Sequence, residues 1–393
     1  MNFSAIHKIL TNTAICAMLC MGHSCVNDNS SCPEDSPGFH EGNEVWLSFD
    51  ISGMDGTDSK RSSRADIIDP DGHPDEEATA AENYINVNDV SVFLLDNNKR
   101  LLKVFNAGEY AITETDADHK NYTLTLNVNR EYFNYAGTSS VTFSIMIVAN
   151  KSGISNNNDA SFTNDMFAMS VSQMANQYKW FGSVADGWTP DIALQMHIPM
   201  AGISTPATLT KEALDAAKTP ETASNAGEIL MQRALAKIRV IDAFNTDPAN
   251  KNGERIQSVS LVSLTEKGAY IPVSDTWPNG TCVLENATMQ SDWFSTVKSL
   301  TLTNTATNTF TGYVTECEVT NLRNPKLIIT VIDNDGKTQK FEYALSSLKN
   351  PGVKAISRNH IYEFEVTKVW EQNINLNYTV CQWGSASTDI DFN

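Results

Sequence analysis

Basic residues are scarce in this 393-residue chain: 28 Lys and Arg stand against 47 Asp and Glu, so the formal net charge is −19. Nucleic acids and anionic membrane surfaces both attract basic proteins, so this charge argues against either as a partner. Beyond the N-terminus, the sequence has no apolar run of the roughly 18 residues that a spanning helix needs. The chain is nevertheless 41% hydrophobic, and it is long enough for two or three domains with their own cores.

The common catalytic motifs are also missing. The sequence contains no G-x-S-x-G nucleophile elbow, no P-loop, no G-x-G-x-x-G after a strand and no H-E-x-x-H, and its seven histidines are scattered singly. We therefore expect no enzymatic activity, no metal ion and no cofactor. An envelope hydrolase stays open as an alternative, because paired carboxylates can meet in a fold without any sequence signature.

Two segments resemble binding sites. The acidic stretch "DPDGHPDEE" (residues 69–77) offers oxygen ligands for Ca²⁺, but its spacing differs from that of the twelve-residue calcium loop. We interpret it as a solvated linker. The aromatic residues of "KWFGSVADGW" (Trp180, Phe181 and Trp188) are compatible with a sugar-stacking platform or with core anchors, and we favour the core anchors.

Cysteines are few, and none has the C-x-x-C or Cys/His spacing of a zinc site. The N-terminal sequence is typical of a secretory signal peptide: Lys8 precedes a modest apolar stretch, and small residues stand just before Cys25. We predict a lipoprotein signal peptide over residues 1–24 and lipidation at Cys25, with Cys20 as a poorer alternative. A Cys282–Cys317 disulfide is conceivable, but the pairing cannot be read from sequence.

Strands follow the N-terminal region. Residues 44–52, "EVWLSFDIS", alternate strictly, with Val45, Leu47, Phe49 and Ile51 on one face, which is the period of a half-buried strand. Similar short runs recur throughout the chain, with turn residues such as Asn97-Asn98 and Asp335-Gly336 between them. The pattern predicts an all-β fold with short helical insertions, namely a two-domain β-sandwich of the transthyretin-like or Greek-key type.

The domain boundary is placed where periodicity fades, in a Thr-, Ala- and Pro-rich segment that begins near residue 203. We expect a tether and a first strand over residues 25–64, an N-terminal sandwich over 65–205 and a C-terminal sandwich over 206–393. The last long alternating run places Ile374, Leu376, Tyr378 and Val380 on one face.

A protease-sensitive segment follows the first strand. "KRSSRAD" is polar, lacks any strand or helix pattern, and offers Lys60, Arg61 and Arg64 to a trypsin-like protease. A core strand directly before such a segment needs a functional explanation. The alternative is that residues 44–52 form a permanent strand and that the basic loop is incidental.

Several motifs, in their order and spacing over most of the chain, resemble one family. They are "SSCPED", "KRSSRAD", "ENYINVNDVSVFLLDNNKRLL", "FSIMIVANKSG", "IPMAG", "QRALAKIRV", "TGYVTE", "RNHIYEFEVTKV" and "NYTVCQW". Together they resemble the fimbrillins of Bacteroidales type V pili, the FimA/Mfa-like group of lipoprotein pilins.

The resemblance implies a function for the protease-sensitive segment. Similar pilins reach the outer membrane as lipoproteins, and an arginine-specific protease then removes their first strand. A strand from the C-terminal region of a neighbouring subunit fills the groove that opens. Transferred to this sequence, the displaced strand is residues 44–52, the cut follows Arg64 or, second, Arg61, and the donor comes from residues 374–392.

The physical chemistry agrees with this reading. Burial of the four inward residues of the first strand stabilises by roughly 6–12 kcal/mol, which approaches the whole stability of a domain. Strand addition by a second chain would restore that burial and the hydrogen bonds. We therefore expect a cell-surface pilus subunit whose partners are other pilus subunits and, before maturation, the outer membrane. The alternative is a monomeric surface lipoprotein, or a fimbrial tip or anchor protein, that binds a glycan or host protein.

Overall fold

Strands dominate the computed structural model. It describes residues 44–53, 76–117, 119–133, 139–154, 167–176, 180–244, 250, 253–272, 298–306, 308–318, 324–347, 355–369 and 373–384. Residues 42–393 form one compact unit. Within the described ranges, no helix is both long enough and apolar enough to cross a membrane. The all-β prediction is confirmed.

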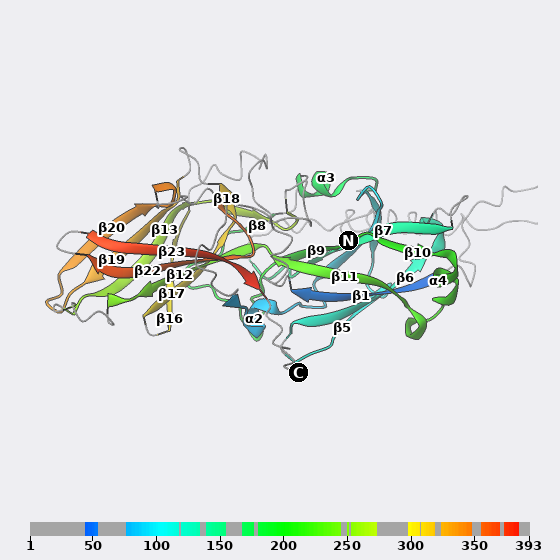
Figure 1. The fold of residues 1–393 in the computed structure, drawn as a ribbon, viewed down its shortest axis with the longest axis horizontal. Coiled ribbons are helices and arrows are strands. Elements are labelled where there is room, and N and C mark those ends of the chain that lie inside the picture. Colours follow the sequence, from blue (N-terminus) through cyan, green and yellow to red (C-terminus); the bar gives the residue numbers. More distant parts are fainter. Residues whose placement is uncertain are drawn as a thin grey trace, which may run out of the picture. The chain divides into compact units, whose positions relative to one another are not determined.

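The largest sheet has the strand order β4-β3-β7-β9-β11-β1-β6-β5, and β10 pairs with an earlier stretch of the β7 edge that β9 also joins (Figure 1). Its strands are β1 (Glu44–Gly53), β3 (Val90–Asp96), β4 (Leu101–Phe105), β5 (Tyr110–Glu114), β6 (Asn121–Asn129), β7 (Ser140–Ala149), β9 (Met200–Ser204), β10 (Ala207–Thr210) and β11 (Ser224–Arg233). The predicted domain boundary at residues 205/206 falls between β9 and β10, which pair with the same edge of β7. The division into domains stays a prediction.

Two further sheets are built from later strands. One has the order β16-β17-β12-β22-β23-β2 and contains β2 (Glu76–Glu77), β12 (Leu235–Asp242), β16 (Thr303–Ala306), β17 (Thr309–Thr315), β22 (His360–Val369) and β23 (Asn373–Gly384). The other has the order β15-β13-β19-β20, with β13 (Arg255–Leu264), β15 (Lys298–Thr301), β19 (Lys326–Ile332) and β20 (Thr338–Ala344). Two small pairs are β8 (Trp180–Gly182) with β14 (Lys267–Ala269), and β18 (Cys317–Glu318) with β21 (Ala355–Ile356).

The described helices are short, as the sequence predicts. They are α2 (Ala80–Asn83), α3 (Val171–Asn176), α4 (Lys211–Ala216) and the 3-10 turns η2 (Arg130–Tyr132), η4 (Pro220–Thr222) and η7 (Leu345–Ser347). Thr210 begins α4 as a true N-cap, because its hydroxyl accepts a hydrogen bond from the Ala213 amide at 3.3 Å.

Local sequence explains both predicted hairpins. Strands β3 and β4 pair across the Asn97-Asn98 turn, where Lys99 adopts a positive φ of 57°. Strands β19 and β20 pair across Asp335-Gly336, and Gly336 has φ 78°, a conformation that glycine adopts without strain. Both hairpin predictions are confirmed.

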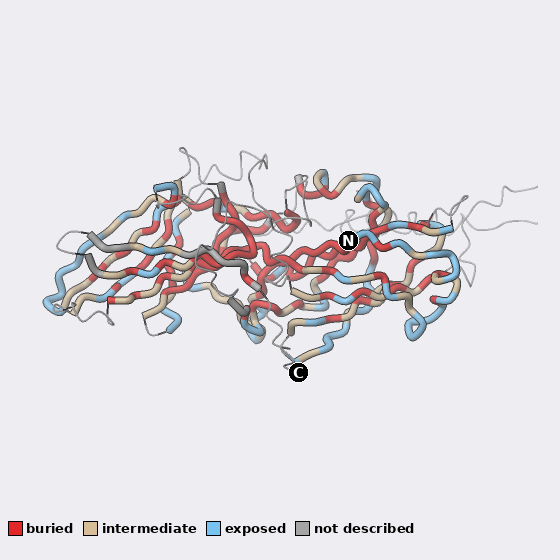
Figure 2. Tube along the Cα trace, in the orientation of Figure 1, coloured by how far each residue is buried: buried red, intermediate tan, exposed pale blue. Residues whose placement is uncertain are grey.

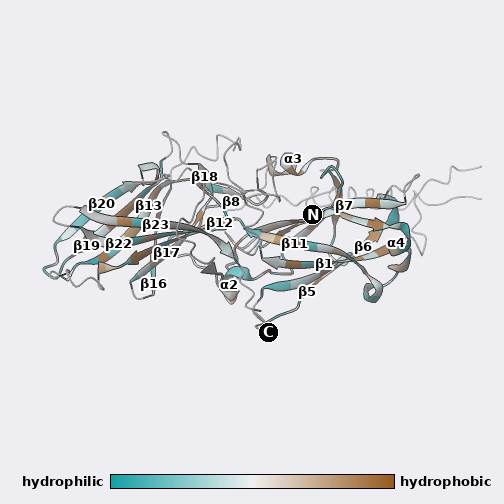
Figure 3. Cartoon of the chain, in the orientation of Figure 1, coloured by the Kyte–Doolittle hydropathy of each residue, from teal (hydrophilic) through white to brown (hydrophobic). Residues whose placement is uncertain are grey.

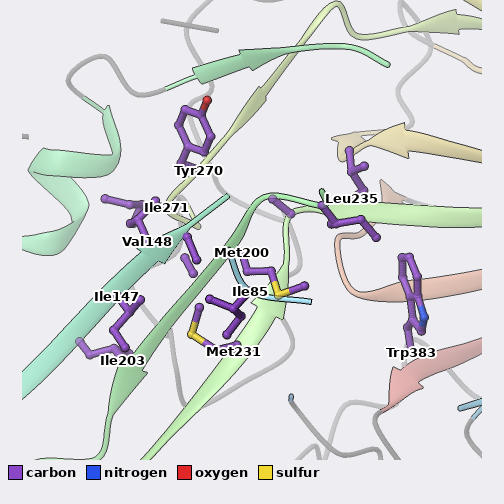
Figure 4. Packing of buried hydrophobic residues seen from close by; sticks show 14 of the residues in the cluster. Ile85, Ile147, Val148, Met200, Ile203, Met231, Leu235, Tyr270, Ile271 and Trp383 are labelled. Atoms are coloured by element: carbon purple, nitrogen blue, oxygen red, sulfur yellow. The ribbon is translucent and has the colours of Figure 1, made fainter. Parts of the chain in front are cut away.

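A continuous core runs between the strands. Buried segments fill the middle of most strands, whereas exposed residues gather at the turns (Figure 2), and hydrophobic and hydrophilic residues succeed one another along the strands (Figure 3). Met200, Ile203, Met231 and Ile85 lie together in this core (Figure 4). Gly202 of "IPMAG" allows this packing, because a Cβ atom there would lie only 2.7 Å from the Leu230 carbonyl oxygen.

Candidate functional site

The first strand lies inside the largest sheet. On one side β1 pairs in parallel with β11, from Leu47↔Ser224 to Gly53↔Met231. On the other side it pairs antiparallel with β6, from Glu44↔Asn129 to Ser52↔Asn121 (Figure 1). Removal of β1 would therefore open a slot between β11 and β6, with unpaired backbone groups on both walls.

The inward face of β1 is completely buried. Val45, Leu47 and Phe49 are 0% exposed and Ile51 is 1% exposed, so the predicted alternation is confirmed. The Phe49 ring meets the Phe143 ring edge-to-face, with centroids 6.5 Å apart, and Phe143 in turn packs on Phe133. This position in the slot is therefore shaped for an aromatic side chain.

Apart from Trp46, the outward face of β1 is polar, and it is partly exposed. The Ser52 hydroxyl donates to the Glu228 carboxylate at 2.6 Å, and the Asn127 amide donates to Glu44 at 2.7 Å. Asp50 lies opposite Glu228 in the register, so two exposed carboxylates share one rung of the ladder. Like charges directly opposite one another destabilise a sheet slightly.

The predicted donor strand has a different setting. Strand β23 pairs with β22 along its length, from His360↔Gln382 to Val369↔Asn373. Among the described residues, its other edge has a partner only at Trp383 and Gly384, where β2 pairs in parallel. Leu376 and Tyr378 are partly buried against the core, and the Tyr378 ring lies 6.2 Å from that of Phe364.

A buried polar cluster fixes the C-terminal end of β23 (Figure 4 shows Trp383). Trp383 is 0% exposed, and the Arg233 guanidinium lies over its ring at 4.8 Å and donates to its carbonyl oxygen at 2.8 Å. Arg233 also donates to the Asn359 side chain at 3.0 Å and to the Glu82 carbonyl at 3.0 Å. The guanidinium thus joins the end of β11 to β23 and to α2.

The carboxylate of Glu82 completes this cluster. It lies 3.1 Å from the Lys237 ammonium and accepts a hydrogen bond from the Tyr313 hydroxyl at 2.6 Å. Burial alone would raise the pKa of Glu82, but Lys237, Tyr313 and the Thr79 amide together hold it below its usual value. Burial and the neighbouring Glu82 carboxylate raise the pKa of Tyr313. Glu82 is therefore ionised at neutral pH and the Tyr313 hydroxyl is a donor.

Several predicted site residues lie outside the described part of the chain. These are Cys25, Arg61 and Arg64, as well as the side chains of Ile374 and Val380. Cys282 also lies outside it, whereas Cys317 is buried, so the pairing of the cysteines stays open. Among the described residues, no group of three or more His, Cys, Asp or Glu side chains is arranged to hold a metal ion.

Of the aromatic residues proposed as core anchors, Phe181 is buried and Trp188 is partly buried against the core. Phe181 is 0% exposed and contacts the Tyr270 ring, with centroids 5.2 Å apart. Trp188 packs edge-to-face on Tyr313. These contacts favour core anchors over a sugar-stacking platform.

Sequence reasoning missed the Arg233 cluster. A signal was available: Arg233 and Lys237 stand within the largely apolar run "ILMQRALAKI" (residues 229–238), and buried charges in such a run need partners. Those partners are residues 82, 313, 359 and 383. They are far apart in the sequence, so no local pattern links them to Arg233 and Lys237.

The sequence itself matches no protein-family model and no curated protein. Solved structures are similar. The tip fimbrial protein Mfa3 from Porphyromonas gingivalis, solved with a C-terminal truncation, has 13% identity and a TM-score of 0.50, over 86% of this chain and 100% of that chain. A fimbrial assembly protein from Parabacteroides distasonis has 15% identity and a TM-score of 0.45, over 85% of this chain and 100% of that chain.

The likeness to Mfa3 establishes the class of fold. This chain has the fold of a Bacteroidales fimbrial protein, so the resemblance found in the sequence is confirmed at the level of the fold.

Proposed function

We propose that this chain is a structural subunit of a type V fimbria with no catalytic role. It is exported as a lipoprotein through Cys25, reaches the outer membrane, is cut after Arg64 or Arg61, and then assembles with other pilus subunits at the cell surface. Its site is the slot that β1 occupies. The internal position of β1 between β11 and β6 carries this proposal.

The position of β1 supplies the physical reason for assembly. A cut between β1 and the rest of the chain leaves the strand held by non-covalent contacts alone, and dilution then favours its loss. The slot left behind exposes unpaired edges and the apolar pocket lined by Phe143. A strand from a second subunit relieves both costs, and such head-to-tail contacts extend into a filament because they do not close.

A disulfide bond that holds β1 in the sheet tests the proposal. Asp50 and Thr123 are register partners on the outward face of β1 and β6, so D50C/T123C places two cysteines at a spacing suited to a disulfide. Residues 26–393 carrying this pair are oxidised, treated with trypsin, and examined by N-terminal sequencing and an unboiled gel. D50C alone is the matched control.

We expect wild type and the D50C control to lose the β1 peptide and form a heat-sensitive ladder. The oxidised D50C/T123C variant should be cut at the same arginine, keep its peptide and stay monomeric until a reductant is added. Ladder formation with this disulfide bond intact would overturn the proposal, as would a nicked wild type that keeps its peptide and remains monomeric.

The second candidate is a tip or anchor protein that keeps β1 permanently and binds a glycan or host protein. It is supported by the description of the similar solved structure as a tip fimbrial protein. A wild-type chain that stays monomeric in the digestion experiment would favour this candidate.

A further inference from the structure

Two segments at opposite ends of the chain have the same order of side chains. The inward residues of β1 are Val45, Leu47, Phe49 and Ile51, in the order β-branched, Leu, aromatic, β-branched. Residues 373–381, "NINLNYTVC", repeat this order with Ile374, Leu376, Tyr378 and Val380. The match is position by position over the nine residues 44–52, and both intervening faces are mostly polar.

The match holds in only one chain direction. When the two segments run the same way, Tyr378 takes the position of Phe49, against the Phe143 ring, and Leu376 takes that of Leu47. In the opposite direction, Tyr378 falls at the position of Leu47 and leaves the aromatic position to Leu376. Cores tolerate substitutions that keep the shape of a side chain better than those that change it, and only the first arrangement places the donor's ring where β1 has a ring, so it is favoured.

We propose that the slot accepts residues 373–381 of a second copy of this chain in the same direction as β1, parallel to β11 and antiparallel to β6. Ile374 takes the place of Val45, and Val380 takes the place of Ile51. This inference rests on the proposed function and adds to it the direction, the register and the specificity position, which is that of Phe49.

The outward face agrees with this register. Thr379 would replace Asp50 and so remove one of the two carboxylates that share a rung with Glu228. Cys381 would replace Ser52, which is the register partner of Asn121. The native Cys381 therefore offers a direct probe of the register.

Cross-linking between subunits tests the proposal. The variant N121C places a cysteine opposite Cys381 of the neighbouring subunit when the donor runs as β1 does. In the opposite direction Cys381 would take the place of Glu44, which pairs with Asn129, so N129C reports that arrangement. Each variant is cut with trypsin, allowed to assemble, oxidised and run on a boiled, non-reducing gel.

We expect covalent ladders from N121C, none from N129C, and none from the control N121C/C381S. A covalent ladder from N129C instead, or a heat-sensitive ladder that neither variant makes covalent, would overturn the proposed register but leave strand exchange intact. Failure of the wild type to form any ladder would overturn the proposed function itself and this inference with it.

A swap of two donor residues gives a second readout. L376Y/Y378L keeps the composition of the donor but places a tyrosine at the position of Leu47. Because overpacking of a core is destabilising, we expect ladder formation to weaken about tenfold or more, while Y378F keeps it at the wild-type level. Stronger assembly of the swapped variant would indicate the opposite direction and overturn the proposal.

Discussion

Strands β1 and β23 resemble each other in sequence but are held in different ways. The backbone of β1 is paired on both sides, and its four inward residues are at most 1% exposed. Among the described residues, β23 is paired with β22 along one edge and with β2 only at its last two residues, and its Leu376 and Tyr378 are partly exposed. A strand that is paired on one side and half-buried costs less to withdraw than an internal one.

Under the proposed function, the two strands have different roles. β1 stabilises the unassembled subunit, so it must be cut before it can leave. β23 leaves more easily along most of its length, but the Arg233 cluster holds its end at Trp383. Tyr378 is partly buried against Phe364 where it now lies, and under the proposal it would take a fully buried aromatic position in the slot of a neighbour. This difference favours transfer of the strand.

Removal of the Arg233 side chain should have one of the two largest effects. In R233M the acceptors on Asn83, Asn359 and the Trp383 carbonyl lose their buried donor. Because each orphaned buried acceptor costs about 1–3 kcal/mol, we expect the free energy of unfolding to fall by about 3–5 kcal/mol. Urea denaturation measures the loss. The Trp383 amide, bonded to the Asn359 carbonyl, should also exchange its hydrogen faster.

Arg239 provides a matched control for that substitution. Its guanidinium pairs with the half-buried Glu363 at 2.8 Å near the surface of the sheet, so R239M should cost less than about 1 kcal/mol. Equal losses in R233M and R239M would contradict the role given to the cluster at the end of β23.

The next prediction compares β1 and β23 directly. F49A removes a fully buried ring and should lower the free energy of unfolding by about 3–5 kcal/mol. L376A removes a partly buried side chain and should cost only roughly 1–2 kcal/mol, because less apolar area returns to water. Urea denaturation of the uncut protein measures both, and equal costs would remove the energetic distinction between β1 and β23.

Acid should weaken the buried cluster of Arg233 and Glu82 that holds the C-terminal end of β23. The folded state lowers the pKa of Glu82 from 4.5, so its contribution to stability is present above about pH 4.5 and is lost as the pH falls through the folded value. We expect E82Q to be less stable than wild type at pH 7 by about 1–3 kcal/mol, because it loses the charged contacts with Lys237 and Tyr313.

Denaturation curves at a series of pH values check this prediction. The difference between wild type and E82Q should shrink progressively below pH 4.5, where the wild-type carboxyl takes up its proton. A constant difference across the whole series would contradict the stabilising role given to the charge of Glu82.

The sequence predicted the local features well and the long-range ones poorly. Alternation identified the inward face of β1, and Asp335-Gly336 identified a hairpin, because strand period and turn chemistry are local properties. The parallel pairing of β1 with β11 joins segments far apart in the chain, and residues 203–227, which lack a clear period, contain β10, α4 and part of β11. The Arg233 cluster was missed for the same reason, since its partners meet only in the fold.

The smallest expected effect concerns the outward face, where β1 and the donor differ in charge. D50T gives β1 the residue that Thr379 would supply and removes one of the two carboxylates on the rung with Glu228. We expect a gain of about 0.2–0.5 kcal/mol in the free energy of unfolding of the uncut protein, measured by urea denaturation at low salt. D50N separates loss of charge from the strand preference of threonine, and molar salt should reduce the gain because it screens exposed charges. A loss of stability in both variants would mean that Asp50 makes a favourable contact on β1, and the donor would then be at a disadvantage at this rung.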